Sequence, residues 1–249
     1  MSHLKGKNVV ITGGTKGIGL ATARHFSEAG AKVLITGSSE TSLQTALGQL
    51  SNVDGLVCDL TDMNQIRSLG ADTQKTMKQV DVLFANAGIA HFRPLQEMTE
   101  QLFDEMMQVN VKGLYFSIQQ IEPMMPSGSA IVVTASIAPR KGQVGLSAYG
   151  ASKGAARAMV RNLAAELTQK NIRINCISPG PVETEIFSRM VDGNEEEAKK
   201  IMARIASTVP QGRVATADEI AHSVDFLCGP GSEFMLGTEI TMDGGKAEL

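Results

Sequence analysis

Short apolar runs alternate with longer helical segments along the chain. The apolar runs predict strands at residues 8–12, 32–36, 55–59, 81–85, 130–135, 172–177 and 239–243. The segments between them predict helices near 17–30, 40–50, 61–78, 99–123, 147–169 and 217–227. Nearly continuous apolar strands are typical of a sheet that helices cover on both faces. The order of the elements therefore predicts an α/β fold built on a doubly wound parallel sheet.

Two stretches add boundaries to this pattern. Thr216–Glu219 spells TADE, a capping box in which the threonine hydroxyl and the glutamate carboxylate satisfy free N–H groups at a helix start. Residues 180–213 interrupt the alternation with glycine, proline and an acidic run, so we expect a mobile insertion beside a substrate site. The chain shows no internal repeat, low-complexity tract or linker. Residues 1–249 are therefore expected to form a single domain.

Composition and charge exclude several classes of protein. Of the 249 residues, 43% are hydrophobic and 20% charged, an ordinary globular balance. The net charge of −3 and the lack of a Lys/Arg block argue against nucleic-acid binding. No apolar run reaches the ~18 residues of a membrane span, and no signal peptide is visible, so we expect a cytoplasmic protein. The cysteines Cys58, Cys176 and Cys228 lie far apart, and the histidines lack ligand spacing, which predicts reduced thiols and no metal.

A glycine-rich turn follows the first predicted strand. The stretch TGGTKGIG, Thr12–Gly19, places Gly13, Gly17 and Gly19 where the first helix opens. Glycine lets a ligand approach the main chain closely, and a helix N-terminus offers N–H groups to a pyrophosphate. A tight strand–helix turn also explains such a pattern, but its place after the first strand favours a dinucleotide site.

The stretch YGASK places Tyr149 and Lys153 four residues apart, on one face of a predicted helix. A free tyrosine has a pKa of ~10. A nearby ammonium group stabilises the phenolate and lowers that pKa, so the phenol could serve as a general acid or base. The bland alternative is an ordinary exposed pair on a helix. The other tyrosine, Tyr115, has Gln119 at the corresponding position.

Two further polar residues are candidates for chemistry. Ser136 follows the strand predicted at 130–135, and ligands of doubly wound sheets sit at the carboxyl ends of strands. Its hydroxyl could therefore stabilise charge that develops on a substrate oxygen. Taken alone, Ser136 fits a turn or helix cap. Asn110 lies inside the long helix predicted at 99–123, where a locally satisfied amide is the simpler explanation.

Further motifs follow in order: CDLTD at 58–62, NAG at 86–88, VNVKG at 109–113, TASIA at 134–138, ISPGPVET at 177–184 and MDGG at 242–245. Together with TGGTKGIG and YGASK, they resemble the short-chain dehydrogenase/reductase family over essentially the whole chain. The resemblance implies a Rossmann-like sheet of about seven strands in the order 3-2-1-4-5-6-7, with helices on both faces. It also implies a nicotinamide cofactor.

The same resemblance implies roles for particular residues. Tyr149 would exchange a proton with the substrate oxygen, and Ser136 would bind that oxygen. Lys153 would bind the nicotinamide ribose, and Asn110 would hold a water that links this lysine to solvent. Asp59 would contact adenine, and residues 177–184 would cover the nicotinamide. The full set of implied cofactor contacts is Gly13, Thr15, Lys16, Gly17, Ile18, Gly19, Gly37, Ser38, Ser39, Asp59, Leu60, Asn86, Ala87, Gly88, Tyr149, Lys153, Ile177, Pro179, Gly180, Val182 and Thr184.

The end of the second strand bears on the choice of cofactor. Folds that select NAD place an acid about ~20 residues past the glycines, where it binds the ribose 2′-hydroxyl. Gly37 occupies that place here, and Lys16, Ser38 and Ser39 could contact a 2′-phosphate. No arginine follows Gly37, as it does in many NADP-preferring relatives, and Lys16 also fits a solvated surface lysine. We favour NADP(H) over NAD(H).

The substrate wall is expected from residues near Tyr149 and from the insertion. The candidates are Ala138, Gln143, Leu146, His91, Phe92, Val182, Phe187 and Met190. His91 also fits a rim residue and Met190 simple packing. Because most of these side chains are apolar, the favoured substrate is a small, mostly apolar ketone or secondary alcohol. The favoured function is therefore that of an NADP(H)-dependent carbonyl reductase.

Two other functions remain open. A 3-oxoacyl-(acyl-carrier-protein) reductase would need a basic patch near the site for its acidic carrier. Residues 124–129 contain no Lys or Arg, and only Lys170 and Arg173 could supply such charge, so this alternative ranks lower. A non-enzymatic dinucleotide sensor is the second alternative, but such sensors usually lack the Tyr–Lys pair.

The helix predicted around Tyr149 also bears on assembly. Small residues such as Ala151, Gly154 and Ala158 lie on several of its faces, which suggests burial on more than one side. Tetramers are common in the family that the chain resembles, so we expect a homotetramer with closed symmetry. Helix propensity alone also explains the alanines.

Overall fold

The computed structural model describes residues 2–184 and 195–249. Its strands are β1 (Asn8–Thr12), β2 (Lys32–Gly37), β3 (Val53–Val57), β4 (Val82–Ala85), β5 (Ala130–Thr134), β6 (Arg173–Pro179) and β7 (Glu239–Met242). Its α-helices are α1 (Gly17–Glu28), α2 (Glu40–Leu47), α3 (Met63–Thr76), α4 (Glu100–Met107), α5 (Leu114–Ile121), α6 (Ser147–Leu167), α8 (Glu195–Ala206) and α9 (Ala217–Cys228). A π-helical segment, η2, spans Gln108–Gly113.

The strands form one seven-stranded sheet in the order β3-β2-β1-β4-β5-β6-β7. Every neighbouring pair is parallel, from β2 beside β3 to β6 beside β7. The predicted strand order and the Rossmann-like fold are thus confirmed. All strands run the same way, so their carboxyl ends, where ligands bind in such folds, lie along one edge.

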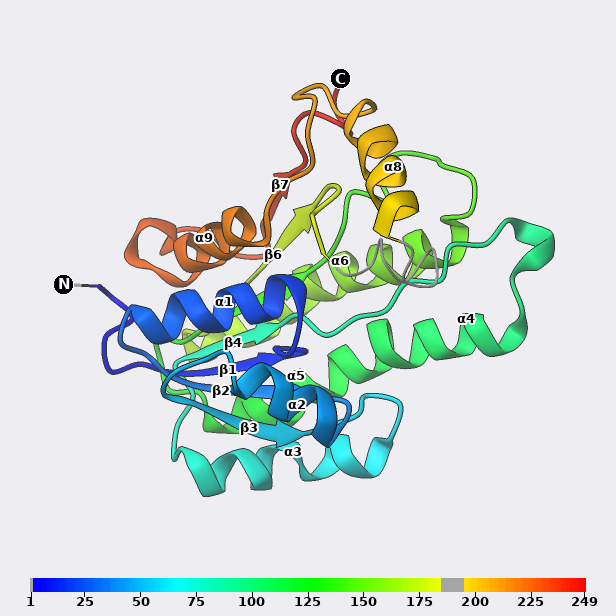
Figure 1. The fold of residues 1–249 in the computed structure, drawn as a ribbon. Coiled ribbons are helices and arrows are strands. Elements are labelled where there is room, and N and C mark those ends of the chain that lie inside the picture. The colour runs from blue at the N-terminus through cyan, green and yellow to red at the C-terminus, as the bar shows by residue number, and fades with distance from the viewer. Residues whose placement is uncertain (1, 185–194) are drawn as a thin grey trace.

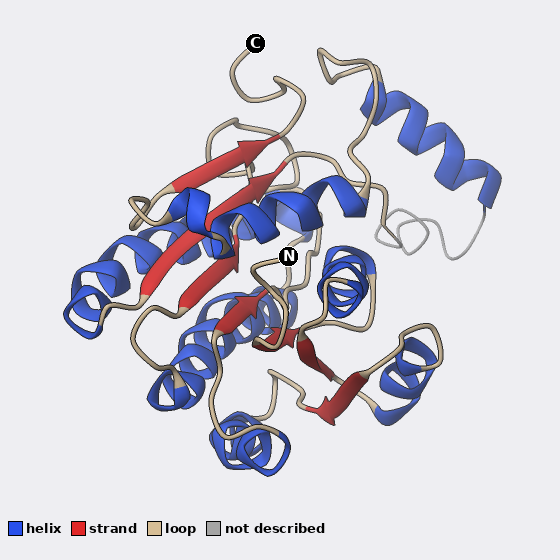
Figure 2. Cartoon of the chain, turned by 90° about the vertical axis from the view of Figure 1, so that its left-hand side faces the viewer, coloured by secondary structure: helices blue, strands red, loops and turns tan. Residues whose placement is uncertain are grey.

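Side chains alternate strictly between the two faces of the central strands. Val10 of β1 packs into one apolar cluster, whereas its neighbours Val9 and Ile11 pack into the other. In β5, Ile131 and Val133 enter the first cluster and Val132 the second. Figure 2 shows the twisted sheet with helices on both sides of it. Successive side chains of a strand point to opposite faces of the sheet, so one apolar strand contributes to both apolar clusters.

The helix predicted at 99–123 differs from the structure in its middle. It is divided into α4, the π-helical segment η2 and α5, with Asn110 inside η2. A π segment takes an extra residue into a turn, and such insertions occur frequently at functional sites. The apolar pattern did not reveal this π segment, because the apolar positions return to the same face of the helix within one turn.

The insertion is partly helical. Helix α8 occupies residues that the sequence placed in an irregular stretch. Acidic residues at a helix start complement the positive end of the dipole, which explains how the acidic run accommodates a helix. In Figure 1, α8 lies near the C-terminal residues, above the long helix α6. Of the insertion predicted at residues 180–213, residues 185–194 lie outside the described residues, and its mobility stays a prediction.

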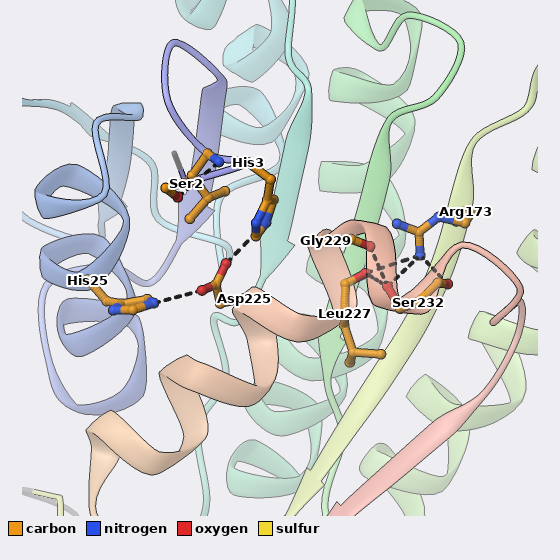
Figure 3. A network of polar contacts seen from close by, with 9 residues as sticks. Ser2, His3, His25, Arg173, Asp225, Leu227, Gly229 and Ser232 are labelled. Atoms are coloured by element: carbon orange, nitrogen blue, oxygen red, sulfur yellow. Dashed lines mark hydrogen bonds and ion pairs between the residues drawn. The ribbon is translucent and has the colours of Figure 1, made fainter.

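The last helix is fixed at both ends. The capping box is confirmed, because Glu219 N–H donates to Thr216 Oγ1 at 3.2 Å and Thr216 N–H donates to Glu219 Oε2 at 2.8 Å. Further along α9, the carboxylate of Asp225 lies 3.0 Å from His25 of α1 and 3.1 Å from His3 (Figure 3). These contacts tie α9 to the helix that follows the glycine-rich turn.

Candidate active site

The glycine-rich turn is built so that larger residues do not fit. Gly13 and Gly17 have positive φ angles of 63° and 51°. A Cβ atom on Gly19 would lie 2.2 Å from the carbonyl oxygen of Gly13 and 2.7 Å from Asn86 Nδ2. The backbone therefore passes close to itself where α1 begins, and N–H groups at this helix start can bind an anion. These residues fit the predicted dinucleotide phosphate site.

Asn86, which follows β4, forms hydrogen bonds with residues at the carboxyl ends of β1 and β5. Its Nδ2 donates to the carbonyl oxygen of Gly13 at 3.0 Å, and its Oδ1 accepts from Thr134 Oγ1 at 3.0 Å. The hydroxyl of Thr12 accepts from the N–H groups of Asn86 and Ala87, both at 3.1 Å. Sequence analysis named Asn86 and Ala87 but missed Thr12 and Thr134. Their position as the last residue of an apolar strand was the signal that could have revealed them.

The end of β2 is closely packed. A Cβ atom on Gly37 would lie 2.5 Å from Thr15 Cγ2, so Thr15 would have to shift to accommodate the acid that selects NAD in other folds. Ser38 is exposed beside it. Ser39 caps α2, accepting from Ser42 N–H at 3.3 Å and donating to Ser42 Oγ at 3.0 Å. Lys16 is the exposed N-cap residue of α1.

The other predicted adenosine contacts lie after β3 and β4. Asp59 Oδ1 accepts from Thr61 N–H at 2.9 Å, which closes the turn after β3. Leu60 is buried, and its carbonyl oxygen accepts from Gln108 at 3.0 Å. A Cβ atom on Gly88 would lie 3.1 Å from Lys153 Nζ, so the residues after β4 lie beside α6.

Tyr149 lies in the first turn of α6, with Lys153 one turn later. Tyr149 forms a hydrogen bond with Ser136, and burial raises the pKa of Tyr149 while this bond lowers it in part. Ser136 Oγ also accepts from the N–H of Ala138 at 3.1 Å, so the serine both caps the turn after β5 and reaches the phenol. We expected Lys153 to lower the pKa of this phenol, but Lys153 is not among the groups that shift it; burial raises the pKa, and only the bond with Ser136 opposes the rise.

Lys153 is a buried cation. Its side chain is 5% exposed, and Nζ donates to the carbonyl oxygen of Thr134 at 2.9 Å. Burial lowers the pKa of Lys153 from 10.5 to about 8. An ammonium group has three donors, so two remain for hydroxyl groups of a ligand such as a ribose.

Asn110 is held by its neighbours. Its Nδ2 donates to the carbonyl oxygen of Ile89 at 2.8 Å and to Ser152 Oγ at 3.0 Å. Its Oδ1 accepts from the N–H of Ile89 at 2.8 Å. The amide thus clamps the residues after β4 and supports α6, where Ser152 in turn donates to the carbonyl oxygen of Tyr149 at 2.8 Å. The predicted contact of Asn110 with a water stays a prediction.

The segment after β6 returns to the glycine-rich turn. The N–H of Gly180 donates to the carbonyl oxygen of Met242 at 2.9 Å, and a Cβ atom on Gly180 would lie 2.7 Å from Asp243 Cα. Val182 is buried and bridges to Ala215. A Cβ atom on Gly17 would lie 3.0 Å from Thr184 Cγ2. The segment predicted to cover the nicotinamide therefore lies against the glycine-rich turn.

Comparisons with known proteins agree with this geometry. Residues 13–247 match a family model described as enoyl-(acyl carrier protein) reductase. The chain belongs to the short-chain dehydrogenase/reductase family. Dehydrogenase/reductase SDR family member 6 of Rattus norvegicus is 32% identical, over 98% of this chain and 99% of the relative. The 3-oxoacyl-(acyl-carrier-protein) reductase FabG of Thermotoga maritima is 33% identical over 98% of each chain. A crystal structure of levodione reductase superimposes with a TM-score of 0.88, at 27% identity and 98% coverage of both chains.

Membership of the short-chain dehydrogenase/reductase family makes the protein an oxidoreductase that uses NAD(P)(H) and acts on a carbonyl or an alcohol. Among the described residues, no helix is both long and apolar enough to cross a membrane. No group of three or more histidine, cysteine or acidic residues in that part of the chain is arranged to hold a metal ion. Cys58, Cys176 and Cys228 are free thiols.

The predicted substrate residues of this short-chain dehydrogenase/reductase fall into two groups. Ala138, Gln143 and Leu146 line a groove of about 540 Å³ against Gly150 and other small residues of α6. Ser136 and Tyr149 are not among the described residues that line this groove. Phe92 instead contacts the Tyr149 ring, and His91 lies 2.9 Å from Glu105 at the rim. Phe187 and Met190 lie outside the described residues.

The two cations considered for carrier docking are wrongly placed for it. Lys170 and Arg173 lie at the amino end of β6, whereas the residues predicted to be catalytic lie at the carboxyl ends of the strands. Lys170 pairs with Glu122 at 2.7 Å. Arg173 donates to the carbonyl oxygen of Leu227 at 3.1 Å and to that of Ser232 at 3.0 Å, as Figure 3 shows. Both cations therefore have local partners at the edge of the sheet opposite the predicted site.

The buried Lys153 predicts a pH-dependent stability. Because burial lowers its pKa from 10.5 to about 8, the unfolded chain binds more protons than the folded one between these values. Stability that depends on this group therefore rises with pH in that window and is lowest below pH 8. Relative to Lys153→Met, the free energy of unfolding of the unmodified protein should rise by about 3 kcal/mol across the window. Denaturant unfolding at several pH values measures this difference, and a constant difference would contradict the burial of a charge-bearing lysine.

Proposed function

We propose that the protein is an NADP(H)-dependent carbonyl reductase that acts on a small, mostly apolar ketone. The observation that carries the proposal is the meeting of Ser136, Tyr149 and Lys153 at the carboxyl edge of the sheet, beside a glycine-rich turn. Bound NADP(H) supplies or accepts the hydride. The protein supplies an acid, a hydrogen-bond donor and a cation around the reacting oxygen.

Each residue has a distinct part in the proposed reduction. Tyr149 donates its hydroxyl proton to the substrate oxygen as the carbonyl carbon receives hydride. Ser136, whose hydroxyl hydrogen reaches the phenol in this structure, turns that hydrogen to the same substrate oxygen and stabilises the charge that develops there. Lys153 keeps its position through Thr134 and offers its remaining donors to the nicotinamide ribose. Its charge favours the phenolate that remains after proton transfer.

An acyl group on a carrier protein is the second candidate substrate. The description of the matching family model and the name of the Thermotoga maritima relative both favour it. The name of the superimposed levodione reductase favours a free ketone. The local pairing of Lys170 and Arg173 removes the only basic side chains that the sequence suggested for carrier docking. We therefore rank the free ketone first.

The packing at Gly37 supports the preference for NADP(H). An acid at this position would collide with the methyl group of Thr15, whose Cγ2 would lie 2.5 Å from the new Cβ. Ser38 is exposed at the same turn and can donate to a 2′-phosphate. The site thus lacks the carboxylate that would repel a phosphate.

Exposed apolar side chains support the proposed homotetramer. Phe234 is fully exposed at 105%, and Phe226 and Leu236 are 47% and 41% exposed. They come from α9 and the residues between it and β7. Exposed apolar surface of this kind is typical of interaction sites, and closed symmetry is the general expectation for a homo-oligomer.

The Tyr149→Phe variant tests the reaction. It should lose about a thousandfold or more in turnover, because it removes the general acid, and it should bind NADPH as the unmodified protein does. NADPH oxidation with a panel of ketones, 3-oxoacyl esters and a 3-oxoacyl-carrier protein measures both the activity and the substrate class. Equal turnover by the variant would overturn the mechanism, and cofactor binding without turnover on any substrate would support a sensor.

A paired substitution tests cofactor choice. Gly37→Asp alone should weaken binding of both cofactors, since the new side chain collides with Thr15. The double variant Gly37→Asp/Thr15→Ser removes the colliding methyl group and should shift the preference toward NADH by about tenfold, or about 1.4 kcal/mol. Calorimetric titration with NADPH and NADH measures this, and Thr15→Ser alone is the control. An unmodified protein that already prefers NADH would refute the NADP(H) assignment.

Assembly is tested at the exposed phenylalanine. Phe234→Asp places a charge in the apolar surface and should reduce the oligomer to a smaller species. Light scattering after size-exclusion chromatography measures the mass. Leu95→Asp is the matched control, because Leu95 is 76% exposed but lies before α4 and far from Phe234 in the sequence. An unmodified protein that elutes as a monomer would overturn the tetramer.

A further inference from the structure

An aromatic contact lies directly on the proposed proton donor. The ring of Phe92 meets the ring of Tyr149 edge to face, with centroids 5.7 Å apart and planes at 83°. Such T-shaped contacts are favourable and directional because the positive edge of one ring faces the negative face of the other. The chain contains only two tyrosines. The other, Tyr115, forms a similar pair with Phe116, at 5.4 Å and 78°.

The backbone that carries Phe92 is fixed on both sides. Ahead of it, the side chain of Asn110 bonds both the N–H and the carbonyl oxygen of Ile89, each at 2.8 Å. Behind it, the N–H of Arg93 donates to the carbonyl oxygen of Gly145 at 3.1 Å. Gly145 belongs to the loop that leads into α6. The segment 89–93 is therefore attached to η2 at one end and to the start of the catalytic helix at the other.

These contacts connect Asn110 to Tyr149 through the protein. Asn110 positions Ile89, the short segment 89–93 positions Phe92, and Phe92 contacts the phenol ring. A second route runs from Asn110 through Ser152 to the carbonyl oxygen of Tyr149. The first route acts on the side chain of Tyr149 and the second on its backbone.

We infer that Phe92 is a positioning residue for Tyr149. Phe92 holds the Tyr149 ring in the orientation that lets the phenol meet Ser136, and it helps to keep the Tyr149 hydroxyl from water. Ser136 holds the oxygen end of the side chain, and Phe92 holds the ring. A tyrosine side chain has two main torsions, so contacts at both ends leave it little freedom. The effect of Phe92 on turnover rests on the proposed function, but its effect on the orientation and ionisation of Tyr149 does not.

The physical consequence concerns the ionisation of Tyr149. Burial raises the pKa of Tyr149, and the Phe92 ring is one of the apolar groups around the phenol. Replacing this ring with a smaller side chain admits water, which stabilises the phenolate. Ionisation of Tyr149 should then begin at a lower pH.

The test uses the two matched aromatic pairs. The chain has no tryptophan, so in a Tyr115→Phe background the ultraviolet absorbance of phenolate reports Tyr149 alone. In that background Phe92→Leu should shift the titration of Tyr149 down by about one pH unit. Phe116→Leu makes the same change at the pair on α5 and should leave the titration unchanged. Circular dichroism at each pH confirms that the chain stays folded, and Phe92→Met provides a second, more volume-conserving variant.

Kinetics provides an independent readout. With a ketone found by the substrate panel, Phe92→Leu should lower kcat by about tenfold, because misplacement of a catalytic group is costly. It should leave the KM for NADPH within about twofold and move the alkaline limb of the pH profile with the titration, because Tyr149 must be protonated to act as the acid. A titration that is unchanged by both Phe92 variants, or that shifts equally in Phe116→Leu, would overturn the inference. Activity retained by Tyr149→Phe would overturn the proposed function and leave the titration result standing.

Discussion

A single buried ammonium group sets the conditions for the rest of the site. Lys153 is 5% exposed and has a carbonyl oxygen of β5 as its protein partner. Burying a charge costs free energy unless polar groups compensate for it. The strand ends supply such groups, because Thr134 receives the ammonium on its carbonyl and engages Asn86 with its hydroxyl. Thr134 of β5 thus links Lys153 of α6 to Asn86, which contacts the glycine-rich turn.

The sheet and most helices could be predicted because local and global signals agree in this chain. Apolar strand runs, a capping box at Thr216 and glycines after β1 each predict the structure that is observed. The positions of Tyr149, Lys153 and Ser136 follow in turn, since a helix fixes residues four apart on one face and parallel strands end at one edge. Positions that follow from the regular repeat of a helix or a strand can therefore be predicted from the sequence.

Features that depend on contacts across the fold could not be predicted. The π-helical turn at Asn110 changes the helical register by one residue and leaves no trace in the apolar pattern. The collision that keeps Gly37 small involves Thr15, which is remote in sequence. Ala138, Gln143 and Leu146 are close to Tyr149 along the chain, yet they line a groove beside α6. Proximity in sequence indicated the correct loop but not the direction of its side chains.

Burial acts on the two titratable residues of the site in opposite directions. It raises the pKa of Tyr149 and lowers that of Lys153 to about 8, because it opposes charge on either group. At neutral pH the phenol is therefore protonated while the lysine remains largely charged. A neutral acid beside a cation is suited to an oxygen that gains negative charge, which is the demand of carbonyl reduction. Alcohol oxidation would need the phenolate, the form that burial disfavours.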